Sequence, residues 1–406
     1  MPDNTNTTGL ALYLAGGVCG DLYPWDLVLE EGFSRLYRGE LTVLSEKKHT
    51  MGELSDLLDK GISLIITQTL ADAKTRRIRC LHGIVTEVRN AGVFSNGKIK
   101  DSYSYVFVIE PELARLRFTR LSAPYYRVNP VDIFEALLDK YGLSANIDGQ
   151  YCSRSKYGKN LLFDQTEASD LDFLKRIAGL YGISFTFVHP QTQAKALSSA
   201  LLYFSDGKQF PLSDIEYSDG RKEKQSGLKF DFLSAAEGQN IWKMESWTMT
   251  QTIGVDGFKL STSYPNANYG SDQWKWGNTE KGSRYLHYHR FFHGYERRTE
   301  TTEVDEDIRL ILEAQCRTAA QAKARWTFGA ANLALRPGLI LELRHFYGMK
   351  DRDCIMALVT GTKLHHRVRW PVDLAVRMED SGGELSEVQG DCMDWGSTAE
   401  KRFCPQ

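Results

Sequence analysis

The chain has 406 residues, of which 42% are hydrophobic and 25% charged, and its formal net charge is −2. These values are ordinary for a soluble globular protein, and at about 150 residues per domain the length indicates two or three domains. They argue against a dedicated nucleic-acid-binding protein, which carries a basic stripe, and no apolar run approaches the ~18 residues of a membrane-spanning helix.

The seven cysteines are odd in number, and no two have the Cys-x-x-Cys spacing of a metal or redox site. This pattern favours reduced thiols in a cytosolic protein over a disulfide framework. The apolar stretch from Gly9 to Cys19 differs from a secretion signal, because no Lys or Arg precedes it and Val18 occupies a position where cleavage needs a small residue. We therefore expect a first strand here.

Residues 1–120 are predicted to form a first β domain. Strand-like runs lie within Leu27–Glu46 and at Ile62–Leu70, and the dipeptide Asn96-Gly97 predicts a tight hairpin. The strand after this hairpin ends at Pro111. Its alternate positions are expected to share one face, namely Tyr103, Tyr105, Phe107 and Ile109.

Residues 121–197 are predicted to form a small α/β domain with two helices. Asn129 is a typical N-cap, Pro130 fits the first helical position, and Gly142 is the expected stop. The second helix is expected to begin after Ser169 and to end at Gly182, before an alternating strand. The apolar stripes of the two helices are Val131, Phe134, Leu137, Leu138 and Tyr141, and Leu171, Leu174, Ile177, Ala178 and Tyr181.

Residues 198–370 are predicted to form a second β domain. Within it, residues from about 255 to 305 are expected to be a loop-rich insertion of long loops or short strands. Glu306–Trp326 is expected to be a helix by its apolar spacing. Closing strands are predicted at Leu333–Phe346 and Asp353–His366, with a turn at Pro337-Gly338. The polar residues 371–406 are expected to be an extension or linker.

Histidines are the first candidates for chemistry. His287 and His289 would share a face of one strand, which suits two metal ligands, with His293 or Glu296 as a possible third. His365 and His366 are adjacent and would face opposite sides of a strand, so they are poorly placed to chelate one ion. Strand-borne histidines are more often packing or surface residues, and we predict no metal site.

Catalytic motifs are absent from the sequence: no nucleophile elbow, metalloprotease, P-loop or dinucleotide-binding pattern occurs. Asp170 and Asp172 lie two apart on a predicted helix, where they favour its N-terminus without facing each other. The basic cluster Arg76, Arg77 and Arg79 fits a solvated strand face. We therefore name no catalytic, cofactor-binding or metal-binding residue and predict no cofactor. Distant carboxylates gathered in a cleft for cell-wall glycoside hydrolysis stay an open alternative.

Two segments nevertheless resemble one family. Gly83–Val88 and the following YVFVIEPELARLRFTRLSAPYYRVNPVDIFEALLDKYGL resemble the first half of VgrG proteins, and FDQTEASDLDFLKRIAGLYGISFTFVH resembles that family's most recognisable segment. The comparable positions are Gln165, Glu167, Asp170, Asp172, Phe173 and Gly182-Ile183, with Gln165 and Glu167 two apart where the family has three. The resemblance extends over residues 10 to 370, and contractile phage tail hubs of the late control D family share it.

The resemblance implies a mainly β, α+β fold with two β-barrel-like domains and a small α/β domain. It implies a non-enzymatic baseplate hub of a type VI secretion or related contractile injection system, with a phage tail hub as the alternative. Three chains would form a ring that adapts a hexameric, Hcp-like tube to a trimeric spike. Other implied partners are baseplate proteins and effector cargo, and no nucleic acid. The hub would assemble in the cytoplasm and be exported through the apparatus without a signal peptide.

The sequence departs from VgrG at its C-terminal end. The family's hub is followed by an OB-type domain and a β-helical spike, whereas here AEKRFCPQ resembles the linker that leads into the spike. The expectation is therefore that the spike is a separate chain or has been lost by truncation.

Overall fold

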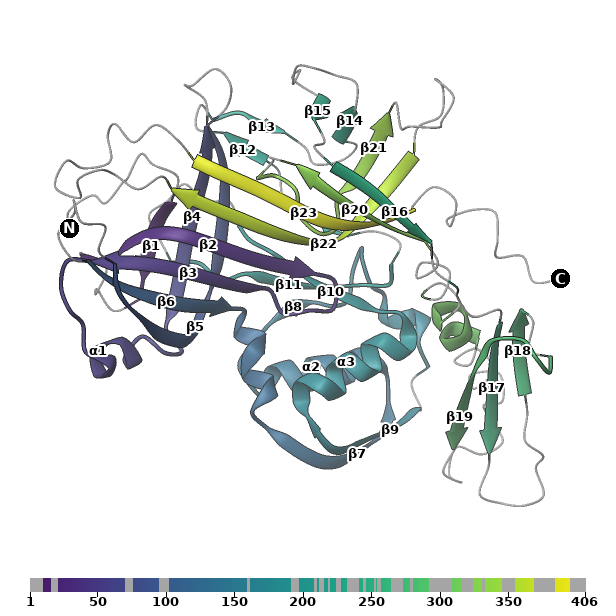
Figure 1. Cartoon of the computed structure of the whole chain (residues 1–406). Helices are drawn as coiled ribbons and strands as arrows, with labels where there is room; N and C mark the ends of the chain where they lie inside the picture. The colour runs from purple at the N-terminus through teal and green to yellow at the C-terminus, as the bar shows by residue number, and fades with distance from the viewer. Residues whose placement is uncertain are drawn as a thin grey trace.

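Most of the regular structure is β, as the sequence predicts (Figure 1). The computed structural model describes residues 10–15, 21–69, 76–94, 102–158, 161–190, 197–207, 210–211, 215–217, 220–223, 228–231, 241–243, 246–251, 253, 257–263, 273–277, 280–291, 309–315, 318, 324–330, 333–344, 355–368 and 384–394.

One large sheet of 15 strands forms the body of the molecule. Its main path runs, in spatial order, through β1 (Leu10–Leu14), β4 (Gly61–Thr69), β5 (Arg76–Phe94), β6 (Ser102–Glu110), β3 (Arg38–Ser45), β2 (Tyr23–Gly32), β22 (Ile355–Val368), β21 (Ile340–Arg344), β14 (Leu228–Asp231) and β15 (Ile241–Lys243). Off this path lie β12 (Ile215–Tyr217), β13 (Lys222–Glu223), β16 (Ser246–Gln251), β20 (Ala324–Ala330) and β23 (Glu384–Asp394).

The pair formed by β2 and β22 joins the beginning of the chain to its last third. The two strands are antiparallel, and their register runs from Asp26 opposite Arg367 to Gly32 opposite Gly361. The strands that the sequence assigns to two β domains therefore belong to one sheet. Among the described pairings this sheet does not close into a ring, so the two separate barrels stay a prediction.

The hydrophobic residues gather in two cores. The first lies against the large sheet and combines residues 10–109 with residues 215–217 and 328–364. The predicted alternation on β6 is confirmed, because Tyr105, Phe107 and Ile109 belong to this core and Tyr103 packs against it. The second core lies in the α/β part and contains the buried faces of both predicted helices.

The α/β part confirms the two predicted helices. Asn129 caps α2 (Pro130–Asp139), and Ser169 caps α3 (Asp170–Tyr181). Gly182 ends α3 in the left-handed conformation that glycine adopts at least cost. The neighbouring elements are β7 (Arg120–Val128), β8 (Ala145–Asn146), β9 (Leu161–Ser169), β10 (Ser184–Val188), β11 (Leu201–Ser205), the short helix α1 (Met51–Ser55) in the first β region, and the 3₁₀ helices η2 (Glu112–Arg117) and η3 (Arg154–Lys156).

Two predictions are wrong in the second half of the chain. The predicted linker 371–406 contains β23, which pairs with both β20 and β22. The predicted helix 306–326 is helical at 309–315, but its last residues belong to β20. In both cases pairing with a distant strand decides the structure, and local composition does not report such pairing. In the loop-rich insertion, short strands are one of the two predicted structures and are confirmed: three strands there form their own sheet.

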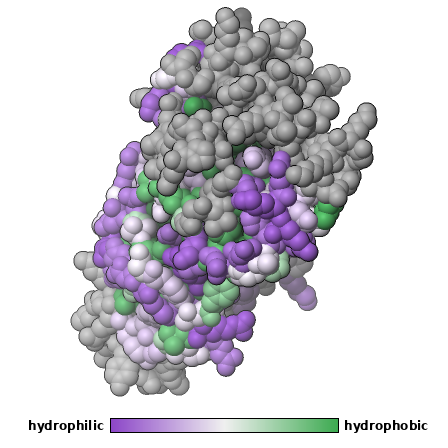
Figure 2. All heavy atoms as spheres, turned by 90° about the vertical axis from the view of Figure 1, so that its left-hand side faces the viewer, coloured by the Kyte–Doolittle hydropathy of each residue, from purple (hydrophilic) through white to green (hydrophobic). Residues whose placement is uncertain are grey.

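The predicted strand over Leu333–Phe346 is also too long, because β21 begins only at Ile340. Gly338 has φ 95°, which fits the predicted turn. The hairpin at Asn96-Gly97 lies outside the described residues, although the antiparallel pairing of β5 with β6 agrees with it. No helix in the described part of the chain is long and apolar enough to cross a membrane. Figure 2 shows hydrophobic residues only as scattered areas among hydrophilic ones on the described part of one face.

Candidate functional site

The structure separates the histidines that the sequence singles out. His287 and His289 belong to one strand, in which His287 lies opposite Lys259, whose charge opposes a bound cation. His293 and Glu296 lie outside the described residues. Among the described residues no three His, Cys, Asp or Glu side chains are grouped to hold a metal ion.

His365 and His366 face opposite sides of β22, as predicted. His365 Nε2 lies 2.8 Å from Asp26 Oδ1 on the outer face, whereas the His366 side chain is fully buried. Arg367 donates to the other oxygen of Asp26 at 2.6 Å. These contacts tie β2 to β22.

Arg79 contradicts the prediction of a solvated basic strand face. Its side chain is 2% exposed and forms an ion pair with Glu31 of β2. Its guanidinium also donates hydrogen bonds to the backbone oxygens of Leu333 at 3.2 Å and Leu335 at 3.0 Å. A buried arginine is stable only when its charge and its N–H groups are satisfied. Through these contacts Arg79 of β5 connects the segment before β21 with β2.

A second set of contacts brings the end of the α/β part to the same place. The backbone N–H of His82 donates to His189 Nδ1 at 3.1 Å, and His82 Nε2 lies 2.9 Å from the backbone oxygen of Pro190. Because a carbonyl oxygen can only accept, His82 carries its proton on Nε2. Ser63 Oγ, at 2.8 Å from His82 Nδ1, then acts as the donor. Tyr37 donates to the backbone oxygen of His82.

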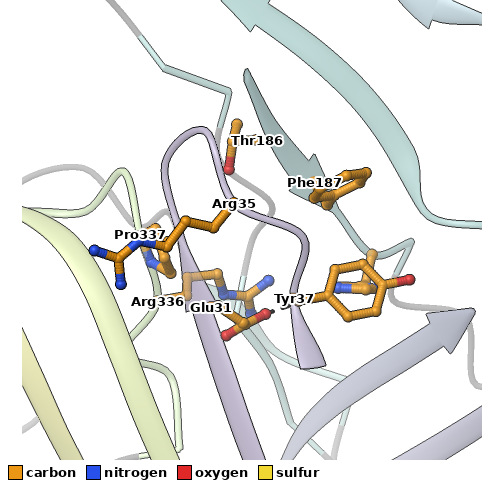
Figure 3. Close-up of a pocket in the computed structure, with 9 residues that line it drawn as sticks. Glu31, Arg35, Tyr37, Thr186, Phe187, Arg336 and Pro337 are labelled. Carbon is orange, nitrogen blue, oxygen red and sulfur yellow. Dashed lines mark ion pairs between the residues drawn. The ribbon is translucent and has the colours of Figure 1, made fainter. Parts of the chain in front are cut away.

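Together these residues form a polar junction, defined here as Glu31, Tyr37, Arg79, His82, His189 and Arg336. It joins β2 and β5 of the large sheet, and Tyr37 just before β3, to the chain after β10 and to the turn before β21. Figure 3 shows Glu31, Tyr37 and Arg336 converging on the pocket, with Thr186 and Phe187 of β10 on its other side.

The pocket at the polar junction is small. Its volume of about 20 Å³ is room for about one water molecule, whereas ligand pockets measure roughly 300–1,000 Å³. Among the residues that line it, Glu31, Tyr37 and His189 are ion-paired or hydrogen-bonded to the protein itself. The junction therefore suits a structural role, in which buried polar contacts fix how three segments pack, better than it suits a reaction.

Burial sets the charge states in the polar junction. It lowers the pKa of His189 well below its usual range, and the nearby His82, Arg79 and Arg336 lower it further. His189 Nε2 lies 3.8 Å from Glu31 Oε1, but since the ring is neutral this contact is not an ion pair. Burial also lowers the pKa of His82, and it lowers the pKa of Arg336 to about 10, so this arginine stays charged at neutral pH.

The family model for the phage tail baseplate hub (GPD) matches residues 30–368, which contain every residue of the polar junction. The match extends over most of the 406 residues. This chain belongs to the phage tail baseplate hub family. No curated protein matches its sequence.

Solved structures share the fold of this hub protein. An Escherichia coli component of the type VI secretion system, described as similar to the T4 bacteriophage tail proteins gp27 and gp5, matches with 14% identity, a TM-score of 0.57, and coverage of 95% of this chain and 77% of its own. A Neisseria meningitidis tail protein matches with 10% identity, a TM-score of 0.55, and coverage of 96% and 97%. At such identities the likeness shows the fold alone.

A Francisella PdpA–VgrG complex also matches the hub protein, with 11% identity and a TM-score of 0.52. The alignment covers 98% of this chain and 58% of the Francisella chain. This likeness and the family match agree with the VgrG resemblance that the sequence shows at residues 83–190.

The segment that carries this resemblance contains a second buried polar cluster. Asp170 is fully buried, and its carboxylate accepts hydrogen bonds from Lys140 Nζ at 2.7 Å, Tyr141 Oη at 2.7 Å and Gln165 Nε2 at 2.8 Å. Burial alone would raise the pKa of Asp170, but these donors outweigh it and hold the pKa below its usual range. Asp170 thus ties α3 to the end of α2 and to β9, a role beyond the helix-terminus effect predicted from sequence. Asp172 lies in the first turn of α3, where its backbone N–H donates to the capping Ser169 Oγ at 3.0 Å and its carboxylate accepts from the Ser169 hydroxyl at 2.7 Å.

Replacing Asp170 with alanine is expected to lower the free energy of unfolding by about 2–3 kcal/mol, because Gln165 and Tyr141 lose an acceptor inside the protein. Urea denaturation of the purified hub protein followed by circular dichroism measures the change. Asp164→Ala is the matched control, because Asp164 is an exposed residue of the adjacent β9. Equal effects of the two substitutions would show that the Asp170 cluster adds no stability.

The neutral histidines of the polar junction make stability depend on pH. Their pKa is lower in the folded than in the unfolded state. Their contribution is therefore complete above the unfolded value of about 6.5 and is lost as the pH falls below it, by at most about 1.4 kcal/mol per pH unit for each histidine. Urea denaturation at pH 7.5, 6.5 and 5.5 is expected to show this loss in the parent protein. His189→Asn keeps an acceptor for His82 and should show a smaller loss, whereas an unchanged slope would contradict the assignment.

Proposed function

We propose that this chain is a structural baseplate hub of a type VI secretion or related contractile injection system. In this proposal three copies form a ring that adapts a hexameric tube to a trimeric spike, and the ring is delivered with the spike. The family match over residues 30–368 carries the proposal. The two predicted β-barrels and the three-chain ring follow from the VgrG resemblance.

The architecture supports a mechanical role. The β2–β22 pair and the buried hydrogen bonds of the polar junction connect both β regions and the α/β part. Such contacts suit a component that has to keep its shape under load. We infer that the protein is not an enzyme, because the pocket at the polar junction has room for about one water molecule.

Exposed aromatic residues suggest where subunits or baseplate partners touch. Phe118 is 77% exposed and Tyr126 is 67% exposed, and the two lie before and within β7. Permanent interfaces bury large apolar areas, so side chains of this kind are expected at their centre. The proposed partners are a second and third copy of the chain, an Hcp-like tube protein, a spike or spike-tip protein, other baseplate proteins and effector cargo, without nucleic acid.

A phage tail hub is the second candidate within the same class. The alignment with the Neisseria tail protein favours it, because it covers 97% of that chain. Both candidates imply the same ring and differ in the machine to which the ring belongs.

Electron microscopy of the purified chain mixed with a tube protein tests the proposal. Rings with threefold symmetry that cap tube ends are expected. Single copies that leave tube ends bare would contradict the hub assignment. The tube proteins of a type VI system and of a phage tail, used in parallel, separate the two candidates.

A further inference from the structure

A small sheet lies apart from the large one, at the lower right of Figure 1. It consists of β17 (Gly257–Ser263), β18 (Gln273–Gly277) and β19 (Tyr285–Phe291). β17 lies in the middle, antiparallel to β18 and parallel to β19. The polar junction and the proposed ring leave this sheet without a role.

The two faces of the small sheet differ. Phe258 of β17 is 1% exposed, so its face of the small sheet is covered at this position. The next row belongs to the opposite face, because side chains alternate along a strand. In this row Lys259 lies directly opposite Lys275 on one side and His287 on the other. Lys275 and His287 are exposed, and Lys259 is half-buried.

This basic row, Lys275–Lys259–His287, lies on strands without a carboxylate. None of the residues in β17, β18 and β19 is Asp or Glu. In the described part of the chain no ion pair involves Lys259 or Lys275. Like charges directly opposite each other destabilise a sheet, so the arrangement disfavours the isolated sheet and favours one that has bound an anion.

We propose that the basic row is a docking surface for an acidic segment of a partner protein. Neighbouring strands are about 4.8 Å apart, and carboxylates three or four residues apart on a helix are separated by about 5–6 Å. A helix with Glu or Asp on one face can therefore place successive carboxylates over Lys275 and Lys259. This proposal depends on the proposed function in one respect: a baseplate hub has to bind other proteins.

Charge and chemistry favour a carboxylate partner over a nucleic acid. The chain has a net charge of −2, whereas a nucleic-acid-binding domain has an extended basic surface. The row contains lysines, which act as point charges, and lacks the forked guanidinium that recognises phosphate through two parallel hydrogen bonds. One short row matches a few carboxylates better than a long phosphate backbone.

Fluorescence anisotropy with the full chain tests this surface. The probe is a labelled helical peptide with glutamates on one face. A peptide of identical composition, with its glutamates spread around the helix, is the control probe. Lys259→Gln/Lys275→Gln is expected to weaken binding of the first peptide about tenfold or more. Lys281→Gln, which removes an exposed lysine between β18 and β19, should have little effect.

Equal binding by the parent chain and the double variant, or equal binding of the two peptides, would overturn the proposal. A single-stranded oligonucleotide or phosphatidylglycerol vesicles that bind through the same lysines more tightly than the peptide would also overturn it, in favour of a phosphate ligand. The result is independent of ring formation. A chain that binds the peptide but stays monomeric would support the docking surface and contradict the hub assignment. A trimer that does not bind the peptide would support the hub assignment and contradict the docking surface.

Discussion

Arg79→Met is expected to lower the free energy of unfolding by about 3–5 kcal/mol, because it leaves the charge of Glu31 in the protein without its arginine. The substitution also removes the donors to the backbone oxygens of Leu333 and Leu335. The segment before β21 then loses its attachment to β5. Urea denaturation followed by tryptophan fluorescence measures the change.

Arg35→Met is the matched control, because Arg35 lines the same pocket but is exposed. It should change the free energy of unfolding by about 0.5 kcal/mol or less. Removing both charges with Glu31→Leu/Arg79→Met should recover part of the loss, since no unpaired carboxylate then stays behind. Additive single effects in this cycle, with no recovery, would show that the ion pair does not couple the two strands.

Gly83→Ala is the second substitution with a large expected effect. A β-carbon at this position would lie 2.5 Å from the backbone oxygen of Glu110 and 2.9 Å from Tyr37 Oη. The oxygen belongs to the neighbouring strand β6, so relief requires a shift of the strand. The same shift disturbs the hydrogen bond from Tyr37 to His82. We expect a loss of about 3 kcal/mol in the free energy of unfolding.

Gly61→Ala provides the control for this position. Gly61 lies in β4, which pairs with β5, and a β-carbon there would meet nothing within 4 Å. Its effect should stay within about 1 kcal/mol of the parent, because only the backbone entropy of glycine changes. Similar thermal and urea stabilities for the two variants would refute the close approach of β5 and β6 at Gly83.

Local signals in the sequence predict the α/β part well. An Asn or Ser cap, an apolar stripe and a closing glycine lie within a few turns of each other, so α2 and α3 can be read from neighbouring residues. The same holds for β6, whose alternating aromatic residues all contact the first core. These elements carry the family resemblance, and the family match confirms it.

Long-range contacts account for what the sequence does not predict. Arg79 appears in the sequence as one of a surface cluster, yet its partners are Glu31 and a backbone segment more than 250 residues away. Likewise β23 has a polar sequence that suggests a linker, but it forms antiparallel backbone pairs with both β20 and β22. The secondary-structure propensity of neighbouring residues contains no information on such pairing.

The solution mass of the purified chain, measured by light scattering across a range of concentrations, tests the hub assignment most directly. A particle of three times the 46.1 kDa chain mass is expected. A chain that stays monomeric at every concentration, and also in the presence of spike and tube proteins, would contradict the proposal that this protein forms a trimeric ring.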